Sequence, residues 1–244
     1  QMCIRDRDNR LLADTARANA AWAVGVCTLD PSAAESVCEL ERLAERYNVR
    51  GVRIEPTRSA RALRAAFDHP EARALWAAAQ RLGIVVCAHV QRPFLSQLAA
   101  LLAAFPDVPV VLDHAAYPRA AEGLDSETVV QVAGLARCPN LHLKLSFAVT
   151  GSEEGYPFRD MHPILLRLIE AFGPERCMWG SDFPCELWLR GKATYQEHLS
   201  LFTTALGLSA SEQTLILERT PLRIWFRDRQ ASGRRDHEGR TGLL

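Results

Sequence analysis

The chain has 244 residues, of which 48% are hydrophobic, and its 29 Lys and Arg balance its 29 Asp and Glu. This length and apolar content suffice for one large core and lie within the range of a single α/β barrel. A net charge of zero excludes a general attraction to nucleic acid or acidic membranes. No apolar run approaches the roughly 18 residues that a membrane span needs.

The seven cysteines are scattered along the chain without a CxxC pair. Cys27, Cys87 and Cys177 lie in apolar, strand-like runs. This usage is typical of reduced core cysteines rather than a disulfide framework, so we expect a protein of the cytoplasm.

Short apolar runs alternate with helical patterns along the whole chain. The apolar runs predict six strands, at residues 22–29, 49–54, 83–90, 108–114, 141–147 and 177–179. Helical periodicity, opening prolines and capping boxes predict helices at residues 11–21, 32–47, 70–82, 93–105, 125–136, 163–172, 193–206 and 209–219. Ser32 with Glu35, and Ser209 with Glu212, are the two expected capping boxes.

Strands that are apolar throughout and alternate with helices indicate an α/β fold with a parallel sheet covered by helices. The alternatives are a (β/α)8 TIM barrel and a doubly wound sheet. The sequence contains neither GxGxxG nor GxxxxGK[ST], the usual nucleotide signatures of doubly wound folds. Six strands are two fewer than a closed barrel needs, so a barrel here would lack its first two strands.

Polar residues stand at the ends of four predicted strands: His89, His114, Lys144 with Ser146, and Asp182. A lone strand-end histidine is more often a hydrogen-bonded core residue, and Asp182 alone could cap the next turn. Two histidines and a carboxylate on different strands of one sheet instead suit a divalent metal or water activation. Asp113 should point to the opposite face of its strand from His114, which favours a packing or capping role for it.

Several motifs in fixed order resemble the amidohydrolase-2 family of the amidohydrolase superfamily, (β/α)8 enzymes that include lactonases and decarboxylases. The motifs are Gly25-Val-Cys-Thr-Leu-Asp-Pro31, Gly51-Val-Arg-Ile54, Val86-Cys-Ala-His89, Val111-Leu-Asp-His114, Leu143-Lys-Leu-Ser146, Tyr156-Pro-Phe158 and Trp179-Gly-Ser-Asp-Phe-Pro184. The family's first strand carries a His-x-His pair, and nothing similar precedes Trp22. We therefore expect a partial barrel domain at residues 8–227. Residues 1–7 are expected to be foreign to the fold and residues 228–244 to form a disordered tail.

The resemblance implies a catalytic pair, with Asp182 as the general base and His114 polarising the attacked group. It implies His89 and Asp182 as metal ligands for one divalent ion, Zn or Mn, although a metal-independent mechanism is equally open. A planar guanidinium matches a carboxylate, so substrate-binding roles are expected for Arg53, Arg119 and Tyr156. For Arg53, a strand-end ion pair with a glutamate such as Glu55 is an equal alternative.

The leading functional hypothesis is a hydrolase that acts on a lactone or a related carboxylate-bearing small molecule. One alternative is a non-oxidative, metal-dependent decarboxylase on the same fold. The other is an inactive remnant, because a barrel without two strands has an open edge. A small-molecule substrate is the expected partner, neither nucleic acid nor a membrane is expected, and a homodimer is compatible with the family.

Overall fold

A computed structural model describes residues 8–56, 69–183 and 191–226. Its centre is one parallel sheet of six strands that pair in the order of the sequence, β1-β2-β3-β4-β5-β6. The strands are β1 (Gly25–Thr28), β2 (Val49–Ile54), β3 (Val85–Ala88), β4 (Val110–Leu112), β5 (Leu141–Leu145) and β6 (Cys177–Trp179). Within the described ranges β1 and β6 each pair on one side only, so the six strands do not close into a ring.

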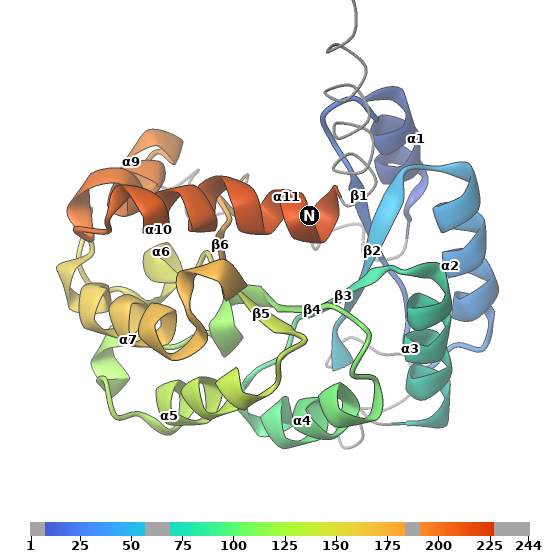
Figure 1. Ribbon diagram of the computed structural model, residues 1–244, viewed down its shortest axis with the longest axis horizontal. Coiled ribbons are helices and arrows are strands. Elements are labelled where there is room, and N and C mark those ends of the chain that lie inside the picture. Colours follow the sequence, from blue (N-terminus) through green and yellow to red (C-terminus); the bar gives the residue numbers. More distant parts are fainter. Residues whose placement is uncertain (1–7, 57–68, 184–190, 227–244) are drawn as a thin grey trace, which may run out of the picture.

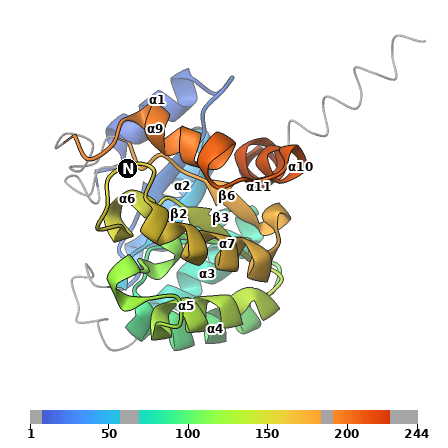
Figure 2. The same ribbon diagram turned by 90° about the vertical axis from the view of Figure 1, so that its left-hand side faces the viewer.

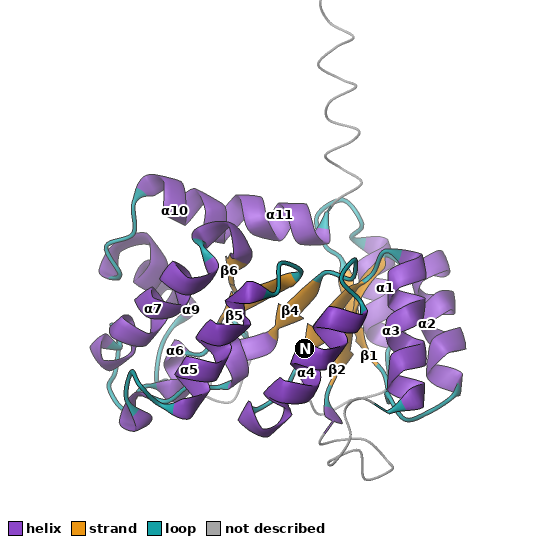
Figure 3. Cartoon of the chain, turned by 60° about the horizontal axis from the view of Figure 1, so that its bottom comes forward, coloured by secondary structure: helices purple, strands orange, loops and turns teal. Residues whose placement is uncertain are grey.

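The helices surround the strands in all three views (Figures 1, 2 and 3). They are α1 (Arg10–Ala18), α2 (Glu35–Arg46), α3 (Pro70–Leu82), α4 (Leu95–Ala104), α5 (Glu127–Gly134), α6 (Ala148–Gly151), α7 (His162–Phe172), α9 (Tyr195–Ser200), α10 (Ala210–Thr214) and α11 (Thr220–Trp225). Each connection between neighbouring strands from β1 to β6 includes a helix, which is how parallel strands are joined. The main core lies between the sheet and these helices, where Leu40, Trp76, Leu98 and Phe172 are buried. In the described part of the chain, no helix is long and apolar enough to span a bilayer.

A second, smaller core lies against another part of the sheet. Val85, Cys87, Val111 and Met178, from β3, β4 and β6, form it together with Ile224 of α11. The neighbouring Trp225 reaches β2, because a Cβ added at Gly51 would lie 2.8 Å from its ring. In Figure 1, α11 runs between β6 and β1, so this short helix connects the two ends of the open sheet.

All six predicted strands are present, and three elements have the predicted bounds: β2 at residues 49–54, α3 at residues 70–82 and β6 at residues 177–179. The capping box of Ser209 and Glu212 is also confirmed. The expected box at Ser32 is wrong, because α2 begins at Glu35 and has no side-chain cap. The Asp30 carboxylate accepts hydrogen bonds from the Ser32 amide and hydroxyl at 2.9 and 2.6 Å, and so holds Ser32 in a turn before the helix. Residues 1–7 and 228–244, for which the sequence predicts a foreign segment and a disordered tail, lie outside the described residues.

Candidate active site

The polar strand ends meet at the carboxyl edge of the sheet. Parallel strands in consecutive order bring their carboxyl ends to the same edge, where barrel enzymes place their catalytic groups. The structure gathers the following side chains there, by direct contact: Arg53, Glu55, His89, Asp113, His114, Tyr117, Lys144, Ser146 and Asp182. The predicted convergence of His89, His114 and Asp182 on one site is therefore present in the geometry.

Asp113 is the buried anion of this group, with 1% of its side chain exposed. Its Oδ1 accepts a hydrogen bond from Lys144 Nζ at 3.0 Å, and its Oδ2 lies 3.5 Å from Arg53 Nε. Burial alone would raise the pKa of Asp113, but the charges of Lys144, His114 and Arg53 outweigh burial and lower it. Burial likewise opposes the charge on Lys144, yet the Asp113 carboxylate raises the pKa of Lys144.

The expectation that Asp113 faces away from the site is wrong. Strand β4 ends at Leu112, so the alternation of side chains no longer applies to the next residue. Arg53, for which the sequence predicts a substrate-binding role, is engaged by other side chains of the protein. It is 6% exposed, and its guanidinium pairs with Asp113 and contacts Nδ1 of His89.

His114 is held in an unusual backbone conformation. It begins a left-handed turn in which His114, Ala115, Ala116 and Tyr117 have φ of 54°, 46°, 61° and 63°. Left-handed conformations cost non-glycine residues about 1 kcal/mol or more each, and strained residues of this kind cluster at functional sites. The turn closes through a backbone hydrogen bond from the Tyr117 amide to the His114 carbonyl at 2.8 Å.

The ring of His114 is fixed from both sides. Its Nδ1 lies 3.0 Å from the Ser146 hydroxyl, and its Nε2 lies 3.8 Å from Oδ1 of Asp182. Burial, followed by the charge of Lys144, lowers the pKa of His114 to about 4. The imidazole is therefore neutral at physiological pH, with one nitrogen facing Asp182.

Asp182 follows β6 in a positive-φ conformation (φ 53°), and its side chain is 29% exposed. Burial raises the pKa of Asp182, and the nearby Lys144 partly offsets that rise. Gly180, which precedes it, allows a close approach, since a Cβ there would lie 2.8 Å from Cε of Lys144. A half-buried carboxylate with a raised pKa that faces solvent and a neutral histidine is a suitable general base.

Tyr117 was not singled out by the sequence. Its ring stacks on His114 with centroids 4.7 Å apart and an interplanar angle of 21°, and its hydroxyl contacts Nε2 of His89. Side chains three residues apart in a tight helical turn lie above one another, which explains the stacking of residues 114 and 117. No local propensity predicts a left-handed turn without glycine, so the sequence carried no signal for this residue.

The structure leaves two of the expected substrate-binding residues outside this group. Arg119 is exposed on the loop after the left-handed turn. Tyr156 is 36% exposed, and its ring packs edge-on against Phe158 at 6.1 Å. Among the described residues, neither side chain has a hydrogen bond or ion pair with the groups at the strand ends.

A divalent metal needs several donor side chains that converge on one point. In the described ranges, no three His, Cys, Asp or Glu side chains are placed to hold an ion together. Of the two expected ligands, His89 contacts Arg53 through Nδ1 and Tyr117 through Nε2, so protein groups engage both nitrogens that could bind metal. In this arrangement the described residues do not fit a metal ion.

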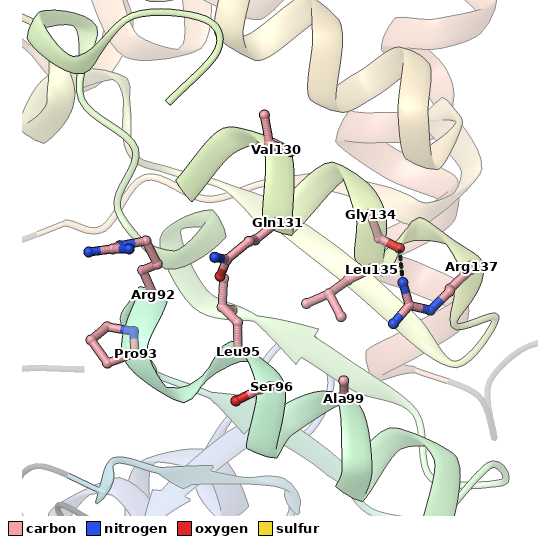
Figure 4. A pocket seen from close by; sticks show the side chains of 10 residues that line it. All are labelled: Arg92, Pro93, Leu95, Ser96, Ala99, Val130, Gln131, Gly134, Leu135 and Arg137. Atoms are coloured by element: carbon pink, nitrogen blue, oxygen red, sulfur yellow. Dashed lines mark hydrogen bonds between the residues drawn. The ribbon is translucent and has the colours of Figure 1, made fainter. Parts of the chain in front are cut away.

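A separate groove lies on the outside of the molecule between α4 and α5 (Figure 4). It has a volume of about 600 Å³, and Leu95, Ala99 and Leu135 contribute to its apolar lining. Arg137 at one end donates to the Gly134 carbonyl at 3.3 Å. The described residues that line it include no carboxylate, histidine or cysteine, whereas the strand ends hold all three acid–base groups His89, His114 and Asp182.

Curated proteins with similar sequences include two kinds of lactone hydrolase. An L-fucono-1,5-lactonase from Burkholderia ambifaria is 34% identical over 90 residues, which are 37% of this chain and 31% of that protein. A 4-sulfomuconolactone hydrolase from Rhizobium radiobacter is 31% identical over 83 residues, which are 34% of this chain and 27% of that protein. The matched stretches thus span less than half the length of these relatives.

Solved structures extend the likeness over most of the chain. An amidohydrolase from Burkholderia multivorans, crystallised with bound zinc, is 29% identical with a TM-score of 0.74, covering 88% of this chain and 78% of that one. A TIM-barrel protein from Bordetella bronchiseptica, 19% identical with a TM-score of 0.69, covers 90% of this chain and 72% of that one, and shows the same fold. The six strands therefore have the arrangement of a TIM barrel, as the sequence predicts.

The family model for amidohydrolases matches residues 1–227, which is most of the sequence. This match confirms the resemblance carried by the strand-end motifs, and the chain belongs to the amidohydrolase family.

Proposed function

We propose that this protein hydrolyses a lactone, with Asp182 as the general base and His114 as the group that polarises the carbonyl. The observation that carries the proposal is the pairing of a half-buried carboxylate with a neutral imidazole, 3.8 Å apart at the carboxyl edge of the sheet. Water hydrogen-bonded to the Asp182 carboxylate fits beside Nε2 of His114, because both atoms can lie within about 3 Å of one oxygen. The lactonase names of the two curated relatives favour the same reaction.

The reaction begins with a proton transfer from water. Asp182 takes a proton from water while the oxygen attacks the lactone carbonyl carbon, and the carbonyl π pair moves onto its oxygen. In the tautomer with its proton on Nε2, Nδ1 of His114 accepts a hydrogen bond from the Ser146 hydroxyl 3.0 Å away, and Nε2–H stabilises that oxyanion. When the tetrahedral intermediate collapses, the ring C–O bond breaks and Asp182 returns its proton to the leaving alkoxide. The product is the open-chain hydroxy acid.

The cluster of Asp113, Lys144 and Arg53 supplies the electrostatic setting of these steps. Two cations share one buried anion, so positive charge remains beside Asp182 and stabilises its ionised form. Arg119 and Tyr156, both exposed, are proposed as outer contacts for the rest of the substrate, including any carboxylate it carries.

The test is a panel of lactones that includes a sugar 1,5-lactone and an acidic muconolactone, followed by NMR detection of the hydroxy acid. We expect Asp182→Asn to abolish turnover with an almost unchanged melting temperature, and His114→Ala to lower kcat strongly. Asp125→Asn serves as the matched control, because its carboxylate is 91% exposed and pairs with Arg167 on the outside. Full activity of Asp182→Asn would remove the general base from the mechanism.

Two further measurements separate the alternatives. Release of CO2 from a carboxylated substrate without ring opening would identify the decarboxylase reaction instead. Treatment with EDTA is expected to leave turnover unchanged. Loss of activity with recovery on adding Zn²⁺ or Mn²⁺ would assign one ion to the site, with His89 and Asp182 as its expected ligands.

A further inference from the structure

Lys144 is the most exposed member of the cluster that it forms with Asp113 and Arg53. Its side chain is 24% exposed, whereas those of Asp113 and Arg53 are 1% and 7% exposed. An ammonium group has three N–H donors, and the Asp113 carboxylate accepts a hydrogen bond from one of them at 3.0 Å. Lys144 therefore offers donors on a side that small molecules can reach, while Asp113 holds the ammonium from the buried side.

The aliphatic part of Lys144 crosses the end of β6 just before Asp182. Lys144 of β5 stands beside Met178 of β6 in the register of the sheet, and Gly180 follows two residues later. A Cβ added at Gly180 would lie 2.8, 3.2 and 3.5 Å from Cε, Cγ and Cδ of Lys144. Because Gly180 has no side chain, the lysine can pass over it and bring its ammonium to the strand end that carries the proposed general base.

The charge of Lys144 acts on both proposed reacting groups. After burial, this charge is the largest influence on the pKa of His114 and on that of Asp182, and it lowers both. The interaction between two charges weakens with distance, so the ammonium lies near both side chains. Nε2 of His114 and Oδ1 of Asp182 are 3.8 Å apart, and the attacked carbonyl is expected beside this pair. The ammonium is therefore close to the place where the carbonyl oxygen becomes negative.

We propose that Lys144 is a catalytic residue, whose ammonium donates a hydrogen bond to the oxyanion of the tetrahedral intermediate. This inference rests on the proposed lactone hydrolysis. Nε2–H of His114 and the ammonium of Lys144 together stabilise the oxyanion. A charged donor forms a stronger hydrogen bond than a neutral one, so Lys144 supplies the larger share.

The movement of charge during the reaction favours this role. Before the reaction, the negative charge lies on the Asp182 carboxylate. When Asp182 takes the proton from water, this charge moves to the substrate oxygen, and a cation beside both positions stays paired throughout. A donor that is already in place stabilises the charge that develops in the transition state.

Lys144 keeps its proton during these steps. Burial opposes its charge, but Asp113 and, more weakly, Asp182 raise the pKa of Lys144. The ammonium therefore only donates a hydrogen bond, and the proton still passes from water to Asp182 and on to the leaving alkoxide.

The first test is Lys144→Met, which removes the ammonium and keeps most of the aliphatic chain. The kcat is measured on the high-pH plateau, where Asp182 is ionised with or without Lys144. Loss of one oxyanion donor typically lowers kcat about 100-fold to 1,000-fold, and we expect a loss of that order with little change in KM. Arg81→Met is the control, since Arg81 is 59% exposed and pairs with Glu41 on the outer helices. A plateau kcat of Lys144→Met equal to that of the control overturns the proposal.

Gly180→Ala tests the same role without removing a charge, and it decides the question if Lys144→Met does not fold. The added Cβ would lie 2.8 Å from Cε of Lys144 and so must displace the ammonium. Misplacing a catalytic group by about 1 Å can cost roughly 100-fold in rate, so we expect a large loss of plateau kcat. Gly155→Ala is the control, because nothing lies within 4 Å of its added Cβ. An unchanged plateau kcat in Gly180→Ala contradicts the assigned position of the ammonium.

A binding measurement completes the test. A six-membered cyclic phosphonate has an anionic, tetrahedral phosphorus group and resembles the intermediate of 1,5-lactone hydrolysis. Calorimetric titration should give a higher affinity for the wild type than for Lys144→Met, and equal affinities overturn the proposal. If the wild type hydrolyses none of the lactones, the proposed function fails and this role fails with it. Turnover by the wild type that Lys144→Met matches overturns the role of Lys144 alone.

Discussion

Lys144 donates a hydrogen bond of 3.0 Å to the buried Asp113, and this pair joins strand β5 to the end of strand β4. The other oxygen of Asp113 lies 3.5 Å from Arg53 at the end of β2. The Asp113 carboxylate therefore links the ends of three strands. Only 1% of its side chain is exposed, so water has little access to it.

Asp113→Asn is expected to destabilise the fold strongly, because it leaves the buried Arg53 and the partly buried Lys144 without their anion. Removing one partner of a buried ion pair typically costs about 3–5 kcal/mol, measurable as a loss in the free energy of unfolding in guanidinium chloride. Asp14→Asn is the comparison, since Asp14 pairs with Arg17 at 3.1 Å on the surface, where such a pair contributes about 1 kcal/mol or less. Equal, small losses for both variants would contradict the assigned role of Asp113.

The stability of the protein should fall as the pH falls from about 6.5 toward 4. Burial lowers the pKa of His142 and of His198 from 6.5 to about 4, as it does for His114. In this window the unfolded chain binds more protons than the folded one, so acid favours unfolding. His198→Phe, next to Trp179 and Phe202, should flatten the dependence of unfolding free energy on pH. An unchanged slope would show that His198 does not contribute.

The pH dependence of kcat/KM should report the raised pKa of Asp182. Activity requires the ionised carboxylate, so it should rise with pH through a single step that lies above the usual range for aspartate, near 3.9. Lys144→Met should move this step to higher pH, because burial raises the pKa of Asp182 and the charge of Lys144 opposes that rise. A step that moves to lower pH, or stays in place, would show that Lys144 does not act on the base.

Gly151→Ala should disturb the loop that follows Tyr117. A Cβ at Gly151 would lie 2.4 Å from the backbone oxygen of Pro118, which cannot move without shifting the left-handed turn. We expect a loss of about 1–3 kcal/mol in stability, as for other overpacked positions, together with lower turnover. Gly155→Ala is the control, since nothing lies within 4 Å of its added Cβ. Circular-dichroism melts and kcat measurements on both variants check the contrast.

Much of the fold follows from local signals in the sequence. The helix at residues 70–82 begins at a proline and ends at Gly83, whose φ of 64° suits glycine. The strand at residues 49–54 is an apolar run between a helix end and a loop. Alternation of such elements implies a parallel sheet, and a parallel sheet gathers His89, His114 and Asp182 at one edge.

The details of the site do not follow from such rules. The direction of the Asp113 side chain depends on where β4 ends. Side chains alternate between the two faces of a sheet only within a strand, and β4 ends at Leu112. Tyr117 reaches its position through a turn that its own residue types disfavour, so only tertiary contacts can specify it. The partners of Arg53 depend on neighbouring strands, because a buried charge pairs with whichever counter-charge the packing brings near.

The position of α11 has a consequence for how the molecule assembles during synthesis. Trp225 and Ile224, near the end of the described chain, pack with residues of β1, β3, β4 and β6 and against Gly51 of β2. The ribosome therefore synthesises all six strands before it adds the α11 residues that complete the second, smaller core. Until then Val85, Val111 and Met178 lack part of their apolar cover, and contacts between such distant segments form slowly. Nascent chains stalled before residue 220 should accordingly be the ones most in need of a chaperone.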